Sequence, residues 1–499
     1  MYLSKVGTGR FPLAAMRAVF FILLGSIVIT LPCKAQTKLV FAHYMVCFKD
    51  YNNGVAGYRQ DIQDAQAIGV DGFVLNCGVW DANYQASVSQ MFQAASGTTF
   101  KLFFSADMGP SSNPITAANI LNMMQTYAGD ANYFHYNGRP VLSTFGGEKI
   151  TGAYGSANAS WWLNNVLAPL RNGGINVYFT PYFYTDSQSE TPTQADIQAN
   201  CNGTALDVFG NSYPGWWNQV ADGLFYFGVG LPTSSSSSSI ITSSRSYATV
   251  AHTNGKTYIA PVLSTYWGRR QTTNVNLGAN PPYYGNGRRY FEMEGPIGVR
   301  AQWNDIIQNQ NPEWVELETW NDFNESYISP IPDAYYPWQY WDVNAPGYFH
   351  CHSGLGAINA YFIDWYKHYT PATCPPPPGY KDNLYWSYRT VPMSFSSLQD
   401  LNGQVTDIRG PIADSIYFMA IMIQPATLQV NSGGTMSWWS LSPGINEIRV
   451  PYHVGAQRFD VLGSSSVLMT GFGDPVTTQF TYNGAPTYNF WYTTGSVHD

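Results

Sequence analysis

Between residues 39 and 370 the sequence alternates β-branched and aromatic runs with amphipathic stretches, and no other feature restricts the fold as much. The stretch YRQDIQDAQAIG (58–69), for example, carries Ile62, Ala65 and Ile68 at helical spacing. Eight runs are predicted strands: LVFAHYMV (39–46), VDGFVLN (70–76), FKLFFSA (100–106), RPVLSTF (139–145), INVYFTPYF (175–183), GLFYFGV (223–229), KTYIAPVL (256–263) and WVELETW (314–320). Eight strands that are each followed by a helix predict an α/β fold, a (β/α)8 TIM barrel.

Two Pro- or Ser-rich segments interrupt this pattern. The serine run at 234–239 is expected to be a solvated loop, whereas PATCPPPPGY cannot continue a helix and marks a domain boundary. After it, alternating stretches with Gly and Asn turns, such as TLQVNSGGTMSWW, predict a small antiparallel β-sandwich. We therefore expect the barrel over 36–370, a Pro-rich linker over 371–379 and the β-sandwich over 380–499.

The N-terminus has the pattern of a secretory signal. Three basic residues precede the apolar run AVFFILLGSIVITL (18–31), and small residues follow up to Ala35. This order predicts a signal peptide over 1–35 that is cleaved on export. An uncleaved anchor is the alternative, but the run is short for a membrane span and no other stretch reaches spanning length. We expect a secreted protein, extracellular or cell-wall associated, without a membrane contact after cleavage.

Cysteine positions allow two disulfides without fixing the pairing. Cys351 and Cys374 flank one helical segment just before the proline run. Cys47 and Cys77 lie at the ends of the first two predicted strands, where neighbouring parallel strands would bring them together. These pairings would leave Cys201 free.

Composition excludes some classes of partner. A net charge of −8 gives no electrostatic case for nucleic acid or an anionic membrane. Low charge (11%) with 16% aromatic residues suits a surface that stacks on neutral sugars, although an aromatic-rich core is the alternative explanation. The sequence has no CxxC or HExxH pattern, and HCH (350–352) lacks metal-ligand spacing, so we expect neither a metal site nor a cofactor.

Polar residues stand where the predicted strands end, which is where barrels of this kind carry their sites. His43 lies near the end of the first strand, Asn76 ends the second, Asp107 follows the third, and the eighth runs into TWNDFNES (319–326). Polar groups after apolar strands are costly unless they face a cavity or one another. Each alone could equally be a satisfied hydrogen-bonding group, but their convergence on one face favours a functional site.

Asp322 and Glu325 stand three apart among aromatic and amide side chains. Two carboxylates in such a setting suit glycosidic cleavage, because one can protonate the leaving oxygen while the other activates water or attacks the anomeric carbon. The alternative is that both only cap the turn after the eighth strand. Spacing does not decide between the short separation of retaining enzymes and the longer one that admits a water.

The motif WNDFNES resembles WNDYGES of glycoside hydrolase family 71, the α-1,3-glucanases or mutanases. The segments VFAHYMV, GVDGFVLNCG, FFSADM, RAQWNDII and NPEWVELETWND also resemble the family's sequence, and the C-terminal β-domain has a counterpart there. The resemblance implies that Asp322 and Glu325 are the catalytic pair of an inverting hydrolase. It further implies that His43, Asn76 and Asp107 line the cleft.

The sequence departs from the family's pattern in three places. Asn324 stands where the family usually has Gly and creates a glycosylation sequon, which we expect to be unmodified because a glycan there would block the cleft. Tyr327 replaces the usual His, and STYWGRR (264–270) stands where the family commonly shows SPWF. These changes bear on the linkage cleaved and on the activity level more than on the reaction class.

The sequence therefore predicts a secreted, monomeric, cofactor-free hydrolase that cleaves α-1,3-glucan internally, with Glu325 as general acid and Asp322 as base, or the reverse. The alternatives are a retaining hydrolase or transglycosylase on another glucan, and a non-catalytic glycan-binding protein on an inactive barrel. Predicted substrate-binding residues are His43, Asn76, Asp107, Trp267, Trp320 and Asn321. Further rings that could stack on glucose, or else pack, are Trp80, Trp216, Trp217, Tyr283, Tyr284, Trp338, Trp438 and Trp439.

Overall fold

The computed structural model describes residues 38–109, 114–148, 158–182, 192–206, 212–213, 217–228, 237–268, 288–323, 326–331, 334–335, 348–368, 381–392, 406–408, 413–478, 481–482, 485–486 and 492–498. Lys38–Asp499 forms one compact unit. The predicted signal peptide (1–35) and linker (371–379) lie outside the described residues. Among the helices that are described, none is long and apolar enough to cross a membrane.

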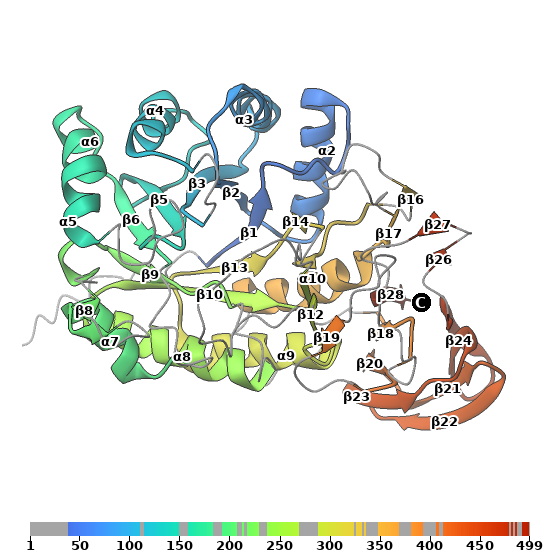
Figure 1. Ribbon diagram of the computed structural model, residues 1–499. Coiled ribbons are helices and arrows are strands. Elements are labelled where there is room, and N and C mark those ends of the chain that lie inside the picture. The colour runs from blue at the N-terminus through green and yellow to red at the C-terminus, as the bar shows by residue number, and fades with distance from the viewer. Residues whose placement is uncertain are drawn as a thin grey trace, which may run out of the picture. The chain divides into compact units, whose positions relative to one another are not determined.

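A curled, largely parallel sheet forms the centre of the fold (Figure 1). Its parallel strands lie in the order β6-β5-β3-β2-β1-β13-β10-β9, and the short β4 (His135–Tyr136) pairs antiparallel with β5. Each predicted strand is found, with bounds that differ by a few residues. The eight strands are β1 (Leu39–Met45), β2 (Gly72–Cys77), β3 (Lys101–Asp107), β5 (Arg139–Phe145), β6 (Tyr178–Pro181), β9 (Gly223–Phe225), β10 (Thr257–Leu263) and β13 (Trp314–Glu318).

The two outer strands of this order, β6 and β9, approach each other. The backbone N–H of Asp222 donates to the Phe179 carbonyl at 2.8 Å, and the Phe179 N–H donates to Asp222 Oδ2 at 2.9 Å. Arg139 holds the same carboxylate through two further hydrogen bonds of 2.8 and 2.7 Å. No strand ladder joins β6 to β9 among the residues described.

Helices follow the strands as the alternation predicts, and they lie around the curled sheet in Figure 1. In α2, the predicted Ile62 and Ala65 are buried, and in α3 the Asp81 side chain caps the first turn. The prediction of a solvated serine loop is wrong in part, because Ser237 opens α8 and is buried. The helices are α2 (Gly54–Ala67), α3 (Ala82–Ala95), α4 (Ala117–Tyr127), α5 (Ala159–Trp162), η1 (Leu163–Leu167), α6 (Ala168–Asn172), α7 (Gln194–Asn202), η2 (Trp217–Gln219), α8 (Ser237–Thr253), α9 (Pro296–Asp305), η3 (Ile306–Gln310) and α10 (Ser353–His368).

Small side chains explain how the serine-rich helix α8 packs. Ser244 is buried and its hydroxyl lies 2.7 Å from the Tyr258 hydroxyl, while also donating to Gln310 Oε1 at 2.6 Å. Ser244 therefore allows a close approach to β10, and its hydroxyl is satisfied there. An apolar stripe on the same helix, which includes Ile240 and Tyr247, completes the buried face.

Aromatic residues fill the interior of the central sheet. Phe41 packs against Phe103 and Phe134 at ring-centroid distances of 5.0 and 4.7 Å, and Phe134 lies 5.5 Å from Trp314. These rings are buried, so part of the aromatic excess in the composition belongs to the core and not to a sugar-binding surface.

Two four-stranded antiparallel sheets follow α10 in the chain. One has the order β23-β20-β18-β28 and the other β22-β21-β24-β25, and one cluster of buried residues includes side chains of both. A buried ion pair, Arg389 Nε to Glu292 Oε1 at 3.1 Å, links β18 to the segment before α9. The strands are β18 (Asn383–Arg389), β20 (Ser415–Met422), β21 (Ala426–Ser432), β22 (Thr435–Leu441), β23 (Gly444–Pro451), β24 (Gly455–Leu462), β25 (Val467–Val476) and β28 (Tyr492–His498).

Short strands complete the described structure. One pair, β7 (Ala205–Leu206) with β8 (Ser212–Tyr213), lies outside the central sheet. Three others form a small sheet: β11 (Tyr266–Gly268), β12 (Arg288–Phe291) and β19 (Thr406–Ile408). The remaining two-residue strands pair as β14 (Asn321–Asp322) with β15 (Ser326–Tyr327), β16 (Ala334–Tyr335) with β17 (Tyr348–Phe349), and β26 (Thr481–Tyr482) with β27 (Ala485–Pro486).

Candidate active site

The motif TWNDFNES directly follows β13, a strand that is buried at every position and lies between β1 and β10. A cis peptide bond joins Glu318 to Thr319. The chain then forms a tight hairpin, in which β14 pairs antiparallel with β15 and Asp322 lies opposite Ser326. Asp322 therefore stands at the carboxyl end of a parallel strand, as the sequence predicts. Its expected partner Glu325 lies outside the described residues.

Hydrogen bonds from the motif's own residues fix the hairpin. The Asp322 backbone N–H donates to Thr319 Oγ1 at 2.8 Å, and the Thr319 hydroxyl donates to the Ser326 carbonyl. Ser326 Oγ in turn donates to the Glu318 carbonyl at 3.1 Å. Tyr327, which departs from the family's pattern, is buried and donates its hydroxyl to the His350 carbonyl at 2.6 Å. Asp322 is thus held by short local contacts, with 7% of its surface exposed.

His43, Asn76 and Glu316 come together from three neighbouring strands. His43 Nδ1 lies 2.6 Å from Glu316 Oε1, and Asn76 Nδ2 lies 3.0 Å from His43 Nε2. Because the amide nitrogen can only donate, Nε2 accepts and the ring proton stands on Nδ1 toward Glu316. Burial raises the pKa of Glu316, and its hydrogen bond with His43 opposes that rise. The ring also packs edge-on against Phe227 at 5.0 Å.

Glu318 lies two positions further along β13 and is 1% exposed. Neither of its carboxyl oxygens has a hydrogen-bond partner among the described residues. Burial raises the pKa of Glu318 well above its ordinary value, and the nearby Glu316 and Asp322 raise it further. The uncharged form avoids a third negative charge beside these two groups. Glu318 is therefore expected to carry a proton at neutral pH.

One group in the described part of the chain has ligand atoms close enough for a metal ion. These are atoms of His43, Glu316 and Glu318, all within 4.8 Å of one another. Both nitrogens of the imidazole are already occupied, by Glu316 and by Asn76, so the ring offers no free lone pair to a cation. These three side chains are therefore better suited to holding protons at defined atoms than to binding a metal ion.

Asp107 ends β3 at the same edge of the sheet. Its Oδ1 accepts the Gly109 N–H at 2.8 Å, and its side chain is partly exposed. Burial raises the pKa of the Cys47 thiol to about 12, and the Asp322 and Asp107 carboxylates contribute to that rise. Both carboxylates therefore lie near the same thiol. The structure thus brings His43, Asn76, Asp107 and Asp322 to one edge, in agreement with the predicted convergence.

Trp320 and Asn321, predicted to bind substrate, make contacts within the protein. The Trp320 ring is fully buried, packs on Phe73 at 5.3 Å and donates from Nε1 to Asp61 at 3.3 Å. Asn321 Oδ1 accepts the Met45 N–H at 2.8 Å, and Nδ2 donates to the Met45 carbonyl at 3.4 Å. In this conformation both side chains fix the hairpin onto β1 and α2. Their contact with substrate stays a prediction.

A buried acid pair, Asp50 and Asp61, supports the hairpin from beneath, and sequence reasoning missed it. The two side chains are hydrogen-bonded to each other, which requires a shared proton. Burial raises the pKa of Asp50 to about 6 and raises that of Asp61 well above its ordinary value. Tyr44 donates to Asp61 at 3.0 Å, and Ser329, just after the hairpin, donates to Asp50.

The sequence also left Glu316 and Glu318 unassigned, although it held a signal for them. In WVELE two carboxylates alternate within an otherwise apolar strand, and side chains two apart on a strand share one face. A buried strand with such a face requires partners or protons for its acids. His43, the partner of Glu316, could not be paired with it from sequence because it lies on the first strand.

The predicted aromatic platforms and disulfides have varied outcomes. Trp80 and Trp217 are buried, with 8% and 0% of their surface exposed, so these two rings pack inside the protein. Trp438 and Trp439 are exposed, at 59% and 38%. Cys47, Cys77 and Cys201 are free thiols, so the Cys47–Cys77 pairing that the sequence allowed is not formed in this structure. Predicted residues outside the described side chains are Trp216, Trp267, Tyr283, Tyr284, Asn324, Trp338 and Cys374.

Comparison with known proteins agrees with the motif. A glucan endo-1,3-alpha-glucosidase of Schizosaccharomyces pombe is 26% identical over 96% of this chain and 99% of its own. A mutanase of Penicillium rubens is 26% identical over 89% and 86% of the two chains. An ascus wall endo-1,3-alpha-glucanase of Schizosaccharomyces pombe is 25% identical over 90% and 94%.

Among solved structures, an endo-alpha-mannosidase from Bacteroides thetaiotaomicron is similar with a TM-score of 0.45, at 13% identity over 67% of this chain and 98% of that one. The model of the family described as Glycosyl hydrolase family 71 matches residues 36–499, which is nearly the whole chain. The protein therefore belongs to glycosyl hydrolase family 71.

Proposed function

We propose that this chain is an endo-acting glycoside hydrolase that cleaves the α-1,3-glucosidic bonds of α-1,3-glucan. Relatives that are similar over nearly their whole length carry the names glucan endo-1,3-alpha-glucosidase and mutanase. The observation that carries the proposal is the position of Asp322, at the carboxyl end of β13 and beside His43, Glu316 and Glu318. No metal or redox cofactor is needed for this reaction class, since two carboxyl groups perform the proton transfers.

In the proposed mechanism Glu325 protonates the leaving glycosidic oxygen and Asp322 activates the attacking water. The order of the two roles is open to reversal, because both residues belong to one hairpin. Inversion follows if the hairpin holds the carboxyl groups far enough apart to admit a water. Asn76 and Asp107 are proposed to line the cleft, and the His43–Glu316 pair supports them from the floor of the site.

In this mechanism, a neutral Glu318 would lower the electrostatic repulsion around the Asp322 carboxylate. A second ionised carboxylate beside Asp322 would repel the negative charge of a base in a buried site. With a proton on Glu318, that repulsion is absent. Glu318 also offers a hydroxyl donor toward the site, because its oxygens have no partner among the described residues.

The proposed architecture is a full (β/α)8 barrel over 36–370, followed by a β-sandwich over 380–499. Its support is the strand order, in which chain neighbours are also sheet neighbours, together with the hydrogen bonds between Asp222 and Phe179. Secretion after cleavage of 1–35 is part of the same proposal, as is a monomeric state. N-terminal sequencing of protein from the medium checks the cleavage: a start near Gln36 is expected, and an intact Met1 on cell-bound protein would contradict it.

The test is incubation of the purified protein with insoluble α-1,3-glucan, with α-1,4- and β-1,3-glucans as matched controls. We expect soluble oligosaccharides of mixed length from the first polymer, as an endo-acting enzyme produces. NMR of the first products should show the β-anomer. The α-anomer would indicate a retaining mechanism, longer products would indicate a transglycosylase, and binding without release would indicate an inactive barrel.

A further inference from the structure

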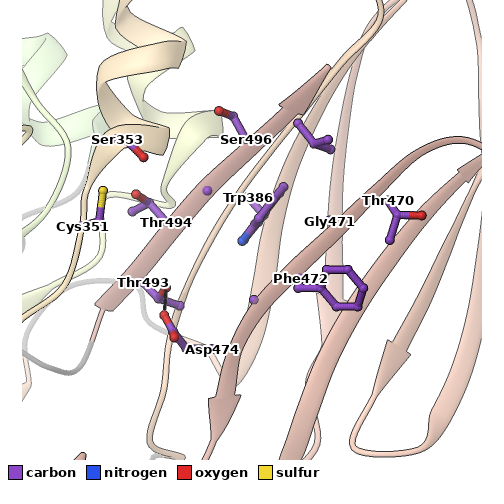
Figure 2. Close-up of a pocket in the computed structure, with 13 residues that line it drawn as sticks. Cys351, Ser353, Trp386, Thr470, Gly471, Phe472, Asp474, Thr493, Thr494 and Ser496 are labelled. Carbon is purple, nitrogen blue, oxygen red and sulfur yellow. Dashed lines mark hydrogen bonds between the residues drawn. The ribbon is translucent and has the colours of Figure 1, made fainter. Parts of the chain in front are cut away.

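A cleft of about 500 Å³ lies on the C-terminal sheets (Figure 2). Its lining comes from β18, β25, β28 and the start of α10, and includes no residue of the central parallel sheet. Strands β25 and β28 are edge strands of their respective sheets, and no ladder joins them among the residues described. The cleft lies between these two edges, and its volume is within the range of about 300–1,000 Å³ typical of ligand sites.

Hydroxyl groups dominate this cleft. Ser353 and Ser496 are exposed in it, and Thr470 and Asp474 are partly exposed; Figure 2 labels all four. Edge strands add backbone N–H and C=O groups that their own sheets leave unpaired. Among the lining residues Val497 alone has an aliphatic side chain. Such a lining matches a ligand that is itself rich in hydroxyl groups.

An exposed ring stands at the rim of the cleft. Phe472 is 70% exposed, the highest value among the large hydrophobic side chains described. The Arg458 guanidinium lies 5.7 Å from the ring centroid and is anchored by Asp460 at 2.9 Å, so the ring has a supported position. The face of an exposed phenyl ring can stack on the apolar face of a sugar ring.

The floor of the cleft is rigid because glycines pack against Trp386. A Cβ atom at Gly495 would lie 2.2 Å from Trp386 Cζ2, and one at Gly471 would lie 2.8 Å from Cη2. Both strands can therefore approach the indole only without side chains at these positions. Beside it the Thr494 hydroxyl is buried and has no hydrogen-bond partner in the described part of the chain. A hydroxyl in that state favours a ligand that can complete its hydrogen bonding.

We propose that this cleft is a second binding site for the α-1,3-glucan chain, separate from the active site; the identity of the ligand rests on the proposed function. A docked peptide strand would use the same backbone edges, but it would also need apolar pockets for alternate side chains, and the lining offers only Val497 and the two rings. A neutral, hydroxyl-rich polymer needs none. A second contact with one long polymer raises the local concentration of the enzyme on an insoluble surface.

The test compares binding isotherms of the full-length protein on insoluble α-1,3-glucan, measured in the cold by depletion from solution. Phe472→Ala should weaken adsorption about 3- to 10-fold, the usual effect of losing one aromatic contact. Thr494→Val keeps the shape and removes an unpartnered hydroxyl, and should weaken adsorption about 2- to 10-fold without loss of folding. Val467→Ala, 53% exposed on the same strand but outside the cleft, is the matched control and should adsorb like wild type.

Hydrolysis of a short, soluble α-1,3-linked glucose oligosaccharide separates this site from the active site. Its rate should be unchanged in Phe472→Ala and Thr494→Val, because a short chain does not reach both sites. If wild type hydrolyses the glucan but both variants adsorb normally, the cleft proposal is wrong and the proposed function stands. If wild type neither adsorbs nor hydrolyses the glucan, both are wrong. A dimer that Phe472→Ala dissociates, with adsorption unchanged, would assign the cleft to a second copy of the chain and overturn the glucan site.

Discussion

Replacing Asn321 by Ala tests whether this side chain positions the hairpin or binds substrate. In the structure its Oδ1 accepts the Met45 N–H at 2.8 Å, and the residue is fully buried. The amide also lowers the pKa of Asp50 in the buried acid pair. The Ala variant removes the amide and keeps the Asp322 side chain itself unchanged. The substitution therefore changes the contacts that hold the hairpin on β1, but none of the hairpin's proposed catalytic residues.

The expected loss of stability follows from these contacts. The Met45 N–H becomes a buried donor without an acceptor, which costs about 1–3 kcal/mol. The Met45 carbonyl keeps its hydrogen bond from Phe48 N–H at 3.0 Å, so it adds little. We therefore expect a total of about 1–3 kcal/mol.

The assay combines calorimetry with steady-state kinetics on a soluble α-1,3-linked oligosaccharide. Asn321→Ala should lower Tm by roughly 1–5 °C in a protein of this size. A shift of the hairpin by even 1 Å should lower kcat by about 10²-fold with KM nearly constant, since positioning acts on the reacting geometry. Asn83→Ala, at an exposed position of α3, is the matched control and should change the unfolding free energy by less than about 0.5 kcal/mol.

The opposite pattern would refute the reasoning. If Asn321→Ala keeps the wild-type Tm and kcat but raises KM, the amide binds substrate, as its place in the motif predicted. Asn321→Asp gives a second check. It keeps an oxygen for the Met45 N–H but places a carboxyl group against Asp50, so its Tm deficit should grow as the pH rises above the ordinary Asp range and both acids ionise.

Three further results are expected. Asp322→Asn and Glu325→Gln should each lower kcat by at least about 10²–10⁴-fold while remaining folded, and the double variant should be much less than multiplicatively worse; near-wild-type turnover in either would falsify the pair. Asp107→Asn should weaken substrate binding but leave measurable turnover, and a loss as complete as that of the pair would reassign the carboxylates. Glu318→Gln tests the proton on Glu318 through the pH dependence of Tm. Burial raises the folded-state pKa, so Glu318 costs stability only above the ordinary unfolded pKa of about 4.3, where the unfolded chain ionises and the folded one does not. The Tm of Glu318→Gln relative to wild type should therefore rise from pH 4 to pH 7, and a difference that is constant with pH would contradict the prediction.

The strand framework was predictable because it depends on local patterns. Buried parallel strands are continuous apolar runs, and helices carry apolar residues at 3.6-residue spacing, so β1 to β13 could be read one window at a time. The end of β13 could not be read in this way. The prediction extended it to Trp320, whereas the strand ends at Glu318. The Trp320 N–H instead bonds to the His43 carbonyl at 2.7 Å, a contact with β1 that no local pattern encodes.

The site was predictable only in part for a related reason. Asp322 stood out because it follows a strand, and the family resemblance singled it out again. The roles of Trp320 and Asn321 depend on which side chains the fold brings beside them, namely Asp61 from α2 and Met45 from β1. A motif residue that faces the protein and one that faces the substrate have the same place in the sequence, so position alone cannot separate the two roles.

Crowded carboxyl groups set the final constraint on how this site works. Asp50, Asp61, Glu316, Glu318 and Asp322 are all buried near one edge of the sheet, and five ionised acids there would repel one another strongly. Three different features relieve the repulsion: Asp50 and Asp61 are hydrogen-bonded to each other, Glu316 bonds to His43, and the raised pKa of Glu318 favours its protonated form. Protons held in this way have no need to move during turnover. We infer that they are not the protons transferred in the proposed mechanism, which assigns that transfer to the hairpin.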